Sequence, residues 1–168
     1  MAREVFSVGV IVAKRALNGP WASHVWLPVA ILPSVPPIPP GTRLTATPEE
    51  TYYLGAAEID LHMRATAHYR DNLTAAQPSI WVHLRPVGDE VELAAVTADP
   101  YEGEGLAEMA SEFVEALPMP PDVQARIQAF TDANFVAETF IKRKRDRADP
   151  EALGRRGRVG GGRRGEDE

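Results

Sequence analysis

Apolar and polar residues alternate along residues 52–63, and this alternation constrains the fold more than any other feature of the sequence. Successive side chains of a β-strand point to opposite faces of a sheet, so a period of two predicts a strand with one buried face. The predicted buried face carries Ala57, Ile59, Leu61 and Met63, and the predicted exposed face carries Glu58, Asp60 and His62. The segment is the clearest strand in the sequence.

Five further segments are expected to be strands because they are apolar and rich in β-branched residues. They are residues 5–12, 25–32, 80–84, 91–96 and 113–117. The turn residues at 86–89 join two of them into a predicted hairpin. The run of prolines that begins at Pro36 cannot donate ladder hydrogen bonds, so residues 36–50 are expected to form a long surface connection.

The clearest helical pattern lies in the second half of the chain, although residues 61–73 are interpreted as a polar turn or short helix after the strand. Apolar residues at Val123, Ile127 and Phe130 recur at helical spacing after Pro120 and Pro121, which suit a first turn. This helix is expected to run on toward Lys144, and a short helical piece is expected at 106–109. These elements predict an α+β fold, with a mainly antiparallel sheet or half-open barrel of five to six strands and one main C-terminal helix.

The charges divide the chain into an acidic body and a basic end. Residues 1–141 hold 8 Lys or Arg against 18 Asp or Glu, whereas residues 142–164 hold 10 against 3. We therefore expect one α+β domain at 1–141 and a disordered, Gly/Arg-rich basic tail at 142–168. The tail is interpreted as a solvated terminus, a dock for an acidic protein or a nucleic-acid contact. Nucleic acid is the least favoured of these partners, because no aromatic side chain lies between the arginines.

Composition and missing motifs exclude several classes of function. The 168 residues include no cysteine, which rules out disulfides, thiolate nucleophiles and cysteine-bound metal centres. The phosphate-loop, dinucleotide-binding, α/β-hydrolase and zinc-protease motifs are also missing. We expect no cofactor and no catalytic residue. The first residues lack a signal-peptide pattern and the apolar runs are interrupted by prolines, so a cytoplasmic protein without a membrane span is expected.

Three segments are candidates for binding or catalysis, each with a structural alternative. Glu58, Asp60 and His62 project from one strand face and suit a divalent metal such as non-haem iron, or they form an ordinary solvent-facing surface. Trp21, His24 and Trp26 form a ledge for a ligand or partner peptide, or they pack over one end of the sheet. The third candidate set lies in residues 61–73, where arginines could grip an anion or the polar groups simply cap a helix. It consists of His62, Arg64, Tyr69 and Asn72, with His68 and Arg70 beside them, and the two arginines are the ones that could grip the anion.

Six stretches, in this order, resemble a proteobacterial family described as a domain of unknown function (number 3305). They are SVGVIV at 7–12, NGPWASHVWLPVAIL at 18–32, YYLGAAEIDLHMRATAHYRDNL at 52–73, VTADPYEGEG at 96–105, LPMPPDV at 117–123 and FIKRKRDR at 140–147. The resemblance implies a genomic setting beside molybdenum-dependent formate dehydrogenase and its maturation proteins. It transfers no catalytic residue.

The leading hypothesis is a non-catalytic accessory or assembly protein whose partner is a molybdoenzyme subunit or a maturation factor. Trp21, His24 and Trp26 are expected to make the contact. The cluster formed by Lys142, Arg143, Lys144 and Arg145 is expected to anchor the partner electrostatically. The alternative is a small-molecule or metal-binding enzyme that uses Glu58, Asp60 and His62.

Overall fold

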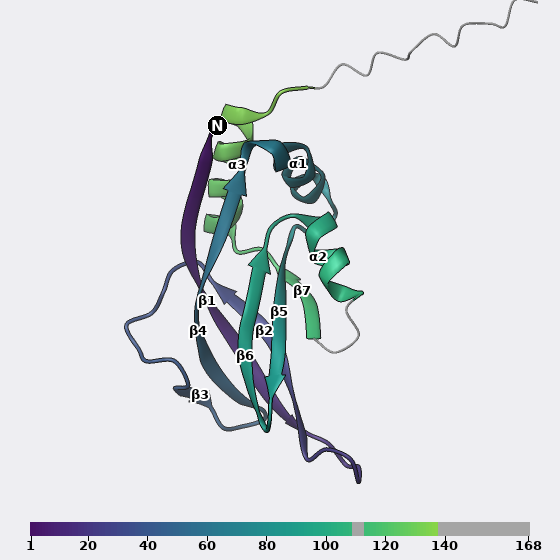
Figure 1. Ribbon diagram of the computed structural model, residues 1–168. Coiled ribbons are helices and arrows are strands. Elements are labelled where there is room, and N and C mark those ends of the chain that lie inside the picture. The colour runs from purple at the N-terminus through teal and green to yellow at the C-terminus, as the bar shows by residue number, and fades with distance from the viewer. Residues whose placement is uncertain (109–112, 138–168) are drawn as a thin grey trace, which may run out of the picture. The chain divides into compact units, whose positions relative to one another are not determined.

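The computed structural model describes residues 1–108 and 113–137, which contain seven strands and three α-helices (Figure 1). The strands are β1 (Arg3–Ala16), β2 (His24–Leu32), β3 (Arg43–Thr45), β4 (Glu50–His62), β5 (Ser79–Val87), β6 (Glu90–Thr97) and β7 (Phe113–Pro118). The helices are α1 (Thr66–Thr74), which follows a 3-10 turn at Met63–Ala65, α2 (Pro100–Ala107) and α3 (Pro121–Asn134). The predicted α+β class with antiparallel strands is confirmed. The half-open barrel is not confirmed, because the described strands form two separate sheets.

The first sheet has the order β2-β1-β4-β3 and is built around β1. β1 pairs antiparallel with β4 along nearly its whole length, from Arg3 opposite His62 to Lys14 opposite Glu50. The alternation predicted for β4 is confirmed, since Ala57, Ile59 and Leu61 are buried. Val8 and Phe6, the β1 partners of Ala57 and Ile59, are also apolar and buried, so both strands turn one face to the core.

The second sheet has the order β6-β5-β7 and contains the predicted hairpin. β5 and β6 meet at a tight turn between Val87 and Glu90. Gly88 in this turn has a φ of +61°, a left-handed conformation that glycine adopts without steric cost. The strand predicted at 113–117 is confirmed as β7, and it pairs with the other edge of β5.

One hydrophobic core is shared by the two sheets, α1 and α3. The helix predicted after Pro120 is confirmed as α3, with Val123, Ile127 and Phe130 buried at helical spacing. The Phe130 ring lies edge-on to Tyr69 of α1, with the ring centroids 6.4 Å apart. These contacts place α1 and α3 together at the end of the β1–β4 ladder where Arg3 pairs with His62 (Figure 1).

The structure corrects three details of the predicted fold. Arg43–Thr45, expected to lie within a surface loop, forms the short strand β3 beside β4, which raises the number of strands to seven in the described residues. Its three exposed residues have no alternation that could have marked it. α2 begins at Pro100 instead of Leu106, because Asp99 caps its first turn by accepting from the Tyr101 and Glu102 amides at 2.9 and 3.4 Å.

The third correction concerns α3, which ends at Asn134 instead of extending toward Lys144. Phe135 has an extended backbone, with φ of −68° and ψ of 123°. The predicted tail at 142–168 lies outside the described residues. None of the helices in the described part of the chain has both the length and the apolar character that crossing a membrane requires.

Candidate partner-binding site

The loop between β1 and β2 carries the most exposed large apolar side chain among the described residues. Trp21 is 96% exposed, whereas neighbouring Leu17 is 43% exposed. The Leu17 amide donates to the Ser23 carbonyl at 3.0 Å and so closes the loop at its base. A free indole of this size is an unusual feature of a protein surface, because tryptophan is highly buried on average.

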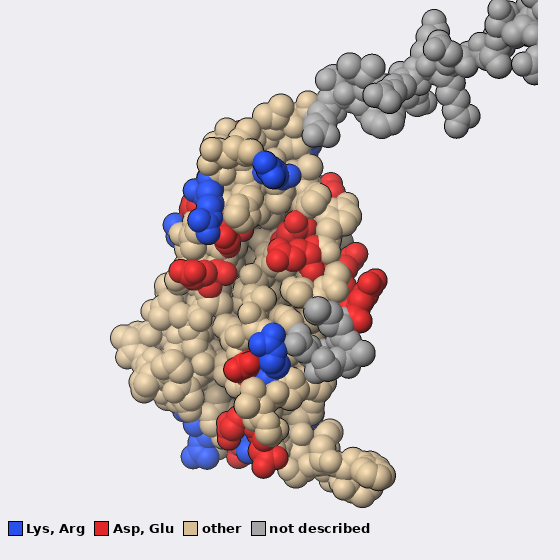
Figure 2. All heavy atoms as spheres, viewed as in Figure 1, with Lys and Arg blue, Asp and Glu red and all other residues tan. Residues whose placement is uncertain are grey.

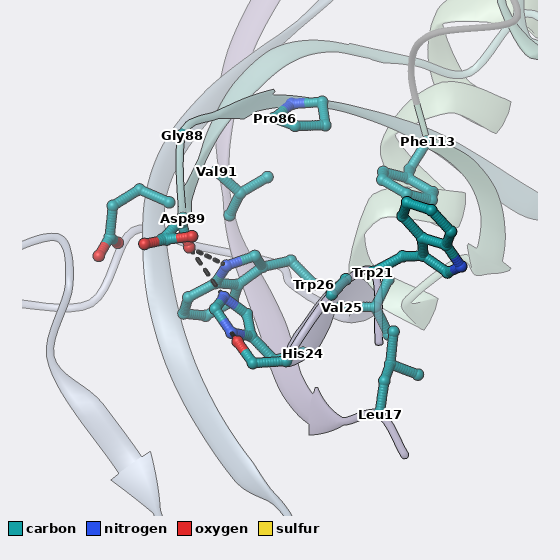
Figure 3. Close-up of a pocket in the computed structure, with 13 residues that line it drawn as sticks. Leu17, Trp21, His24, Val25, Trp26, Pro86, Gly88, Asp89, Val91 and Phe113 are labelled. Atoms are coloured by element: carbon teal, nitrogen blue, oxygen red, sulfur yellow. Dashed lines mark hydrogen bonds between the residues drawn. The ribbon is translucent and has the colours of Figure 1, made fainter. Parts of the chain in front are cut away.

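His24 and Trp26 hold the start of β2 against the tip of the β5–β6 hairpin. His24 Nε2 and Trp26 Nε1 both donate to the Asp89 carbonyl, at 2.9 and 3.0 Å (Figure 3). Since a carbonyl only accepts, the His24 hydrogen lies on Nε2, and in the neutral ring Nδ1 accepts from the Ser23 hydroxyl at 2.9 Å. The ring nitrogens of His24 and Trp26 thus form hydrogen bonds with other residues of the protein. The two residues therefore position the site, while Trp21 remains exposed.

The Trp26 ring is further fixed by its neighbours on the first sheet. Its ring centroid lies 5.5 Å from that of Tyr52 in an edge-on arrangement, and the Lys14 ammonium lies 5.5 Å above it. Trp26 thus fills the structural role that the sequence offered as the alternative to ligand binding.

A hollow of about 350 Å³ lies between this loop, the hairpin tip and the start of β7. Its apolar lining includes Leu17, Trp21, Pro86, Val91 and Phe113, and its charged lining residues are Asp89 and Glu90. Figure 3 shows the Trp21 and Phe113 rings on one side and Asp89 on the other. No Lys or Arg of the described residues lines the hollow. We call this site the Trp21 hollow.

Sequence analysis found only part of the Trp21 hollow. Trp21 was identified from the density of aromatic residues around it. Leu17 and Phe113 had no local signal, and 86–89 was recognised only as a turn. These residues come from separate segments, so only tertiary packing brings them to one hollow.

The candidate metal site formed by Glu58, Asp60 and His62 lies at the other end of β1. Asp60 accepts two hydrogen bonds from the Arg3 guanidinium, at 2.8 Å each, and His62 Nε2 lies 3.3 Å from its Oδ2. The hydrogen bonds from Arg3 lower the pKa of the Asp60 carboxyl, and His62 adds to this shift. Within residues 1–108 and 113–137, no group of three His, Asp or Glu side chains is placed to hold a metal ion. Glu58 is exposed on the same strand face.

Tyr69 and Asn72 are both buried, at 2% and 3% exposure. The Tyr69 hydroxyl accepts from the His62 amide at 3.0 Å, and burial raises the pKa of this phenol. Asn72 Nδ2 donates to the carbonyls of Ser79 and Ala98, at 2.8 and 2.9 Å, and Oδ1 accepts from the Ser79 amide at 3.0 Å. Their polar groups are thus used to fix α1 to the ends of β4, β5 and β6.

The segment around Trp21 and the segment at 58–72 do not form one site. Residue pairing along β1 places His62 opposite Arg3 and His24 opposite Ala16, at the two ends of the strand, which are roughly 40 Å apart at ~3.3 Å per residue. Arg64 lines a different hollow, which has no residue in common with the Trp21 hollow. The predicted cluster at 142–145 lies outside the described residues.

Comparison with known families gives one match, over residues 7–145, to the model described as protein of unknown function (DUF3305). The chain belongs to the DUF3305 family. The family assignment expected from the six stretches is thereby confirmed. Comparisons with curated proteins and with solved structures gave no match.

The DUF3305 match covers β1 from residue 7 onward and the whole of the other strands and helices in the described residues. It therefore includes the loop that carries Trp21, the hairpin tip and the start of β7. The basic residues at 142–145 also fall within the DUF3305 region, whereas residues 146–168 lie beyond it.

Proposed function

We propose that this DUF3305 protein is a non-catalytic accessory protein that holds a segment of a partner protein in the Trp21 hollow. The observation that carries the proposal is the 96% exposure of Trp21 beside the exposed Leu17 and Phe113. Tryptophan contributes strongly to protein interfaces because its large ring loses much water contact when a partner covers it.

The charges around the hollow favour a partner segment of defined chemistry. Asp89 and Glu90 line it, and no ion pair engages either carboxylate among the described residues. Figure 2 shows acidic side chains near the tip of the β5–β6 hairpin, with Lys or Arg side chains beside them, and further acidic side chains beside α2. The matching segment has a large apolar side chain for the hollow and flanking Lys or Arg residues for the carboxylates.

The partner we propose is a subunit of a molybdenum-dependent formate dehydrogenase or one of its maturation factors, met in the cytoplasm. This choice is supported by the family resemblance and not by the geometry of the hollow. The enzyme alternative at Glu58, Asp60 and His62 has no comparable support, because both oxygens of Asp60 bind Arg3.

The test measures binding of the purified full-length protein to purified formate dehydrogenase subunits and maturation factors. Trp21→Ala is expected to weaken binding roughly 30-fold, the effect of losing about 2 kcal/mol at an interface hot spot. Leu17→Ala is expected to weaken it less. The matched control is Leu44→Ala on β3, because Leu44 is 41% exposed, close to the 43% of Leu17, and lies outside the hollow.

Two results would overturn the proposal separately. If Trp21→Ala binds a molybdoenzyme component as tightly as the wild type, the hollow is not the contact. If no such component binds the wild type, the proposed partner is wrong.

A further inference from the structure

A second hollow, of about 550 Å³, opens beside the start of α1, far from the Trp21 hollow. Its charged and titratable lining residues are Arg3, His62, Arg64 and His68, and its apolar lining is Met1, Ala2, Met63 and Ala65. No carboxylate lines it. Within an acidic body this hollow gathers cationic and imidazole groups, and we call it the Arg64 hollow.

The two histidines are held by carboxylates that stand outside the lining. His68 Nδ1 lies 2.8 Å from Asp99 Oδ2, and the His68 ring contacts Tyr101 at a tilt of 52°, with the ring centroids 4.5 Å apart. Because the carboxylate accepts, the hydrogen lies on Nδ1, so Nε2 is the nitrogen left for a ligand. His62 uses Nε2 toward Asp60, which leaves its Nδ1. When a ring is protonated, the nitrogen that does not face its carboxylate also carries a hydrogen and can donate to a ligand.

Of the two arginines in the lining, Arg64 is the one with no ion-pair partner among the described residues. Arg3, by contrast, is committed to Asp60 through two hydrogen bonds. A guanidinium presents planar paired donors that match the oxygens of a carboxylate or phosphate. Arg64 follows His62 closely in the chain, so both approach the hollow from the same turn.

We propose that the Arg64 hollow binds an oxyanion, a carboxylate or phosphate, that is attached to a small apolar group. Arg64 binds the charged oxygens, the protonated rings of His62 and His68 donate from the nitrogens that do not face Asp60 and Asp99, and the apolar lining covers the rest of the ligand. This site is independent of the proposed partner contact, because the two hollows share no residue.

The experiment titrates the full-length protein with inorganic phosphate, acetate and hexanoate, and follows the His62 and His68 ring signals by NMR. Both rings are expected to shift with saturation, and Arg64→Ala is expected to weaken binding roughly tenfold. Arg64→Lys is expected to retain part of the affinity. Hexanoate is expected to bind more tightly than acetate, because only its chain contacts Met63 and Ala65.

The matched control is Arg43→Ala, which removes the same charge from exposed β3, outside the hollow. If Arg43→Ala weakens binding as much as Arg64→Ala does, the effect is one of net charge and the site is refuted. Absence of a ring shift with all three anions also refutes it. Equal affinity for acetate and hexanoate would refute the apolar part of the site. A phosphate preference would identify a phosphorylated ligand, and a hexanoate preference a carboxylate.

Discussion

Asp60 shows how one side chain of an exposed strand face acquires a specific partner. The residue that pairs directly with Asp60 on β1 is Val5. Arg3 lies two residues before Val5, on the same face of the sheet, and reaches Asp60 diagonally across the two strands. The alternation of β4 placed Asp60 on the polar face correctly. It could not reveal Arg3, because that residue lies 57 positions earlier and the two meet only after the strands pair.

The Asp60–Arg3 pair predicts a pH-dependent stability. The pKa of Asp60 is lowered below its usual 3.8 in the folded protein, so its stabilisation is complete above that value. It is lost as the pH falls through the lower folded pKa. Asp60→Asn is therefore expected to lower the free energy of unfolding slightly at neutral pH, and the difference from wild type is expected to vanish in strong acid.

Urea denaturation at neutral and at strongly acidic pH measures this difference. Glu58→Gln is the control, because Glu58 lies on the same strand face and forms no ion pair among the described residues. A deficit of Asp60→Asn that stays constant into strong acid would contradict the assignment.

At the scale of elements, α2 is held unusually close to the second sheet. A Cβ added to Gly103 would lie 2.2 Å from Cγ of Trp81, whereas one added to Gly105 would meet nothing within 4 Å. Two glycines within eight residues conceal the helical pattern, although Asp99 and Pro100 mark the start of the helix. The sequence could therefore show a cap but not the length of α2.

Gly103→Ala is expected to destabilise the fold by about 1–3 kcal/mol, because the new methyl group collides with the Trp81 ring and α2 must shift. Gly105→Ala, in the same helix and in open space, is expected to stabilise it by about 0.5–1 kcal/mol through its higher helix propensity. Chemical denaturation of both variants tests the pair. Equal effects of the two substitutions would show that α2 does not rest on Trp81.

At the scale of the whole described body, the two sheets are joined at one end by the core under α1 and α3. At the other end they are joined by His24 and Trp26, which both donate to the Asp89 carbonyl of the hairpin tip. This second connection supports one wall of the Trp21 hollow. It has few buried apolar residues around it, so it is expected to open more readily than the core.

Trp26→Phe is expected to weaken this connection by about 1 kcal/mol, since it removes one of the two hydrogen bonds to Asp89. Hydrogen exchange of the amides at the hairpin tip, Gly88 and Glu90 among them, is expected to accelerate. Val96 and Thr97, at the far end of β6, serve as the internal control. Acceleration along the whole hairpin would indicate general destabilisation instead of local opening.

The sequence predicted elements better than it predicted sites. Period-two alternation and turn residues located most strands, because these signals depend on each segment's own geometry. The short β3 has no such signal, and its pairing depends on the neighbouring β4. The same reason explains why Trp21 could be named as a candidate while Phe113, on β7, could not. A hollow made by three segments has no signature in any one of them.

The ladder between β1 and β4 has a consequence for how quickly the chain reaches its native state. It joins residues as distant as Arg3 and His62, so its formation must close a loop that contains β2, the proline-rich connection and β3. Chains dominated by such distant pairings fold slowly, since the entropy of loop closure is lost before the contacts form. Until then the apolar stretch from Val8 to Val12 has one unpaired edge, which is the form in which strands aggregate. A newly made chain is therefore most vulnerable to aggregation in its first strand, and this strand is the segment a chaperone would protect.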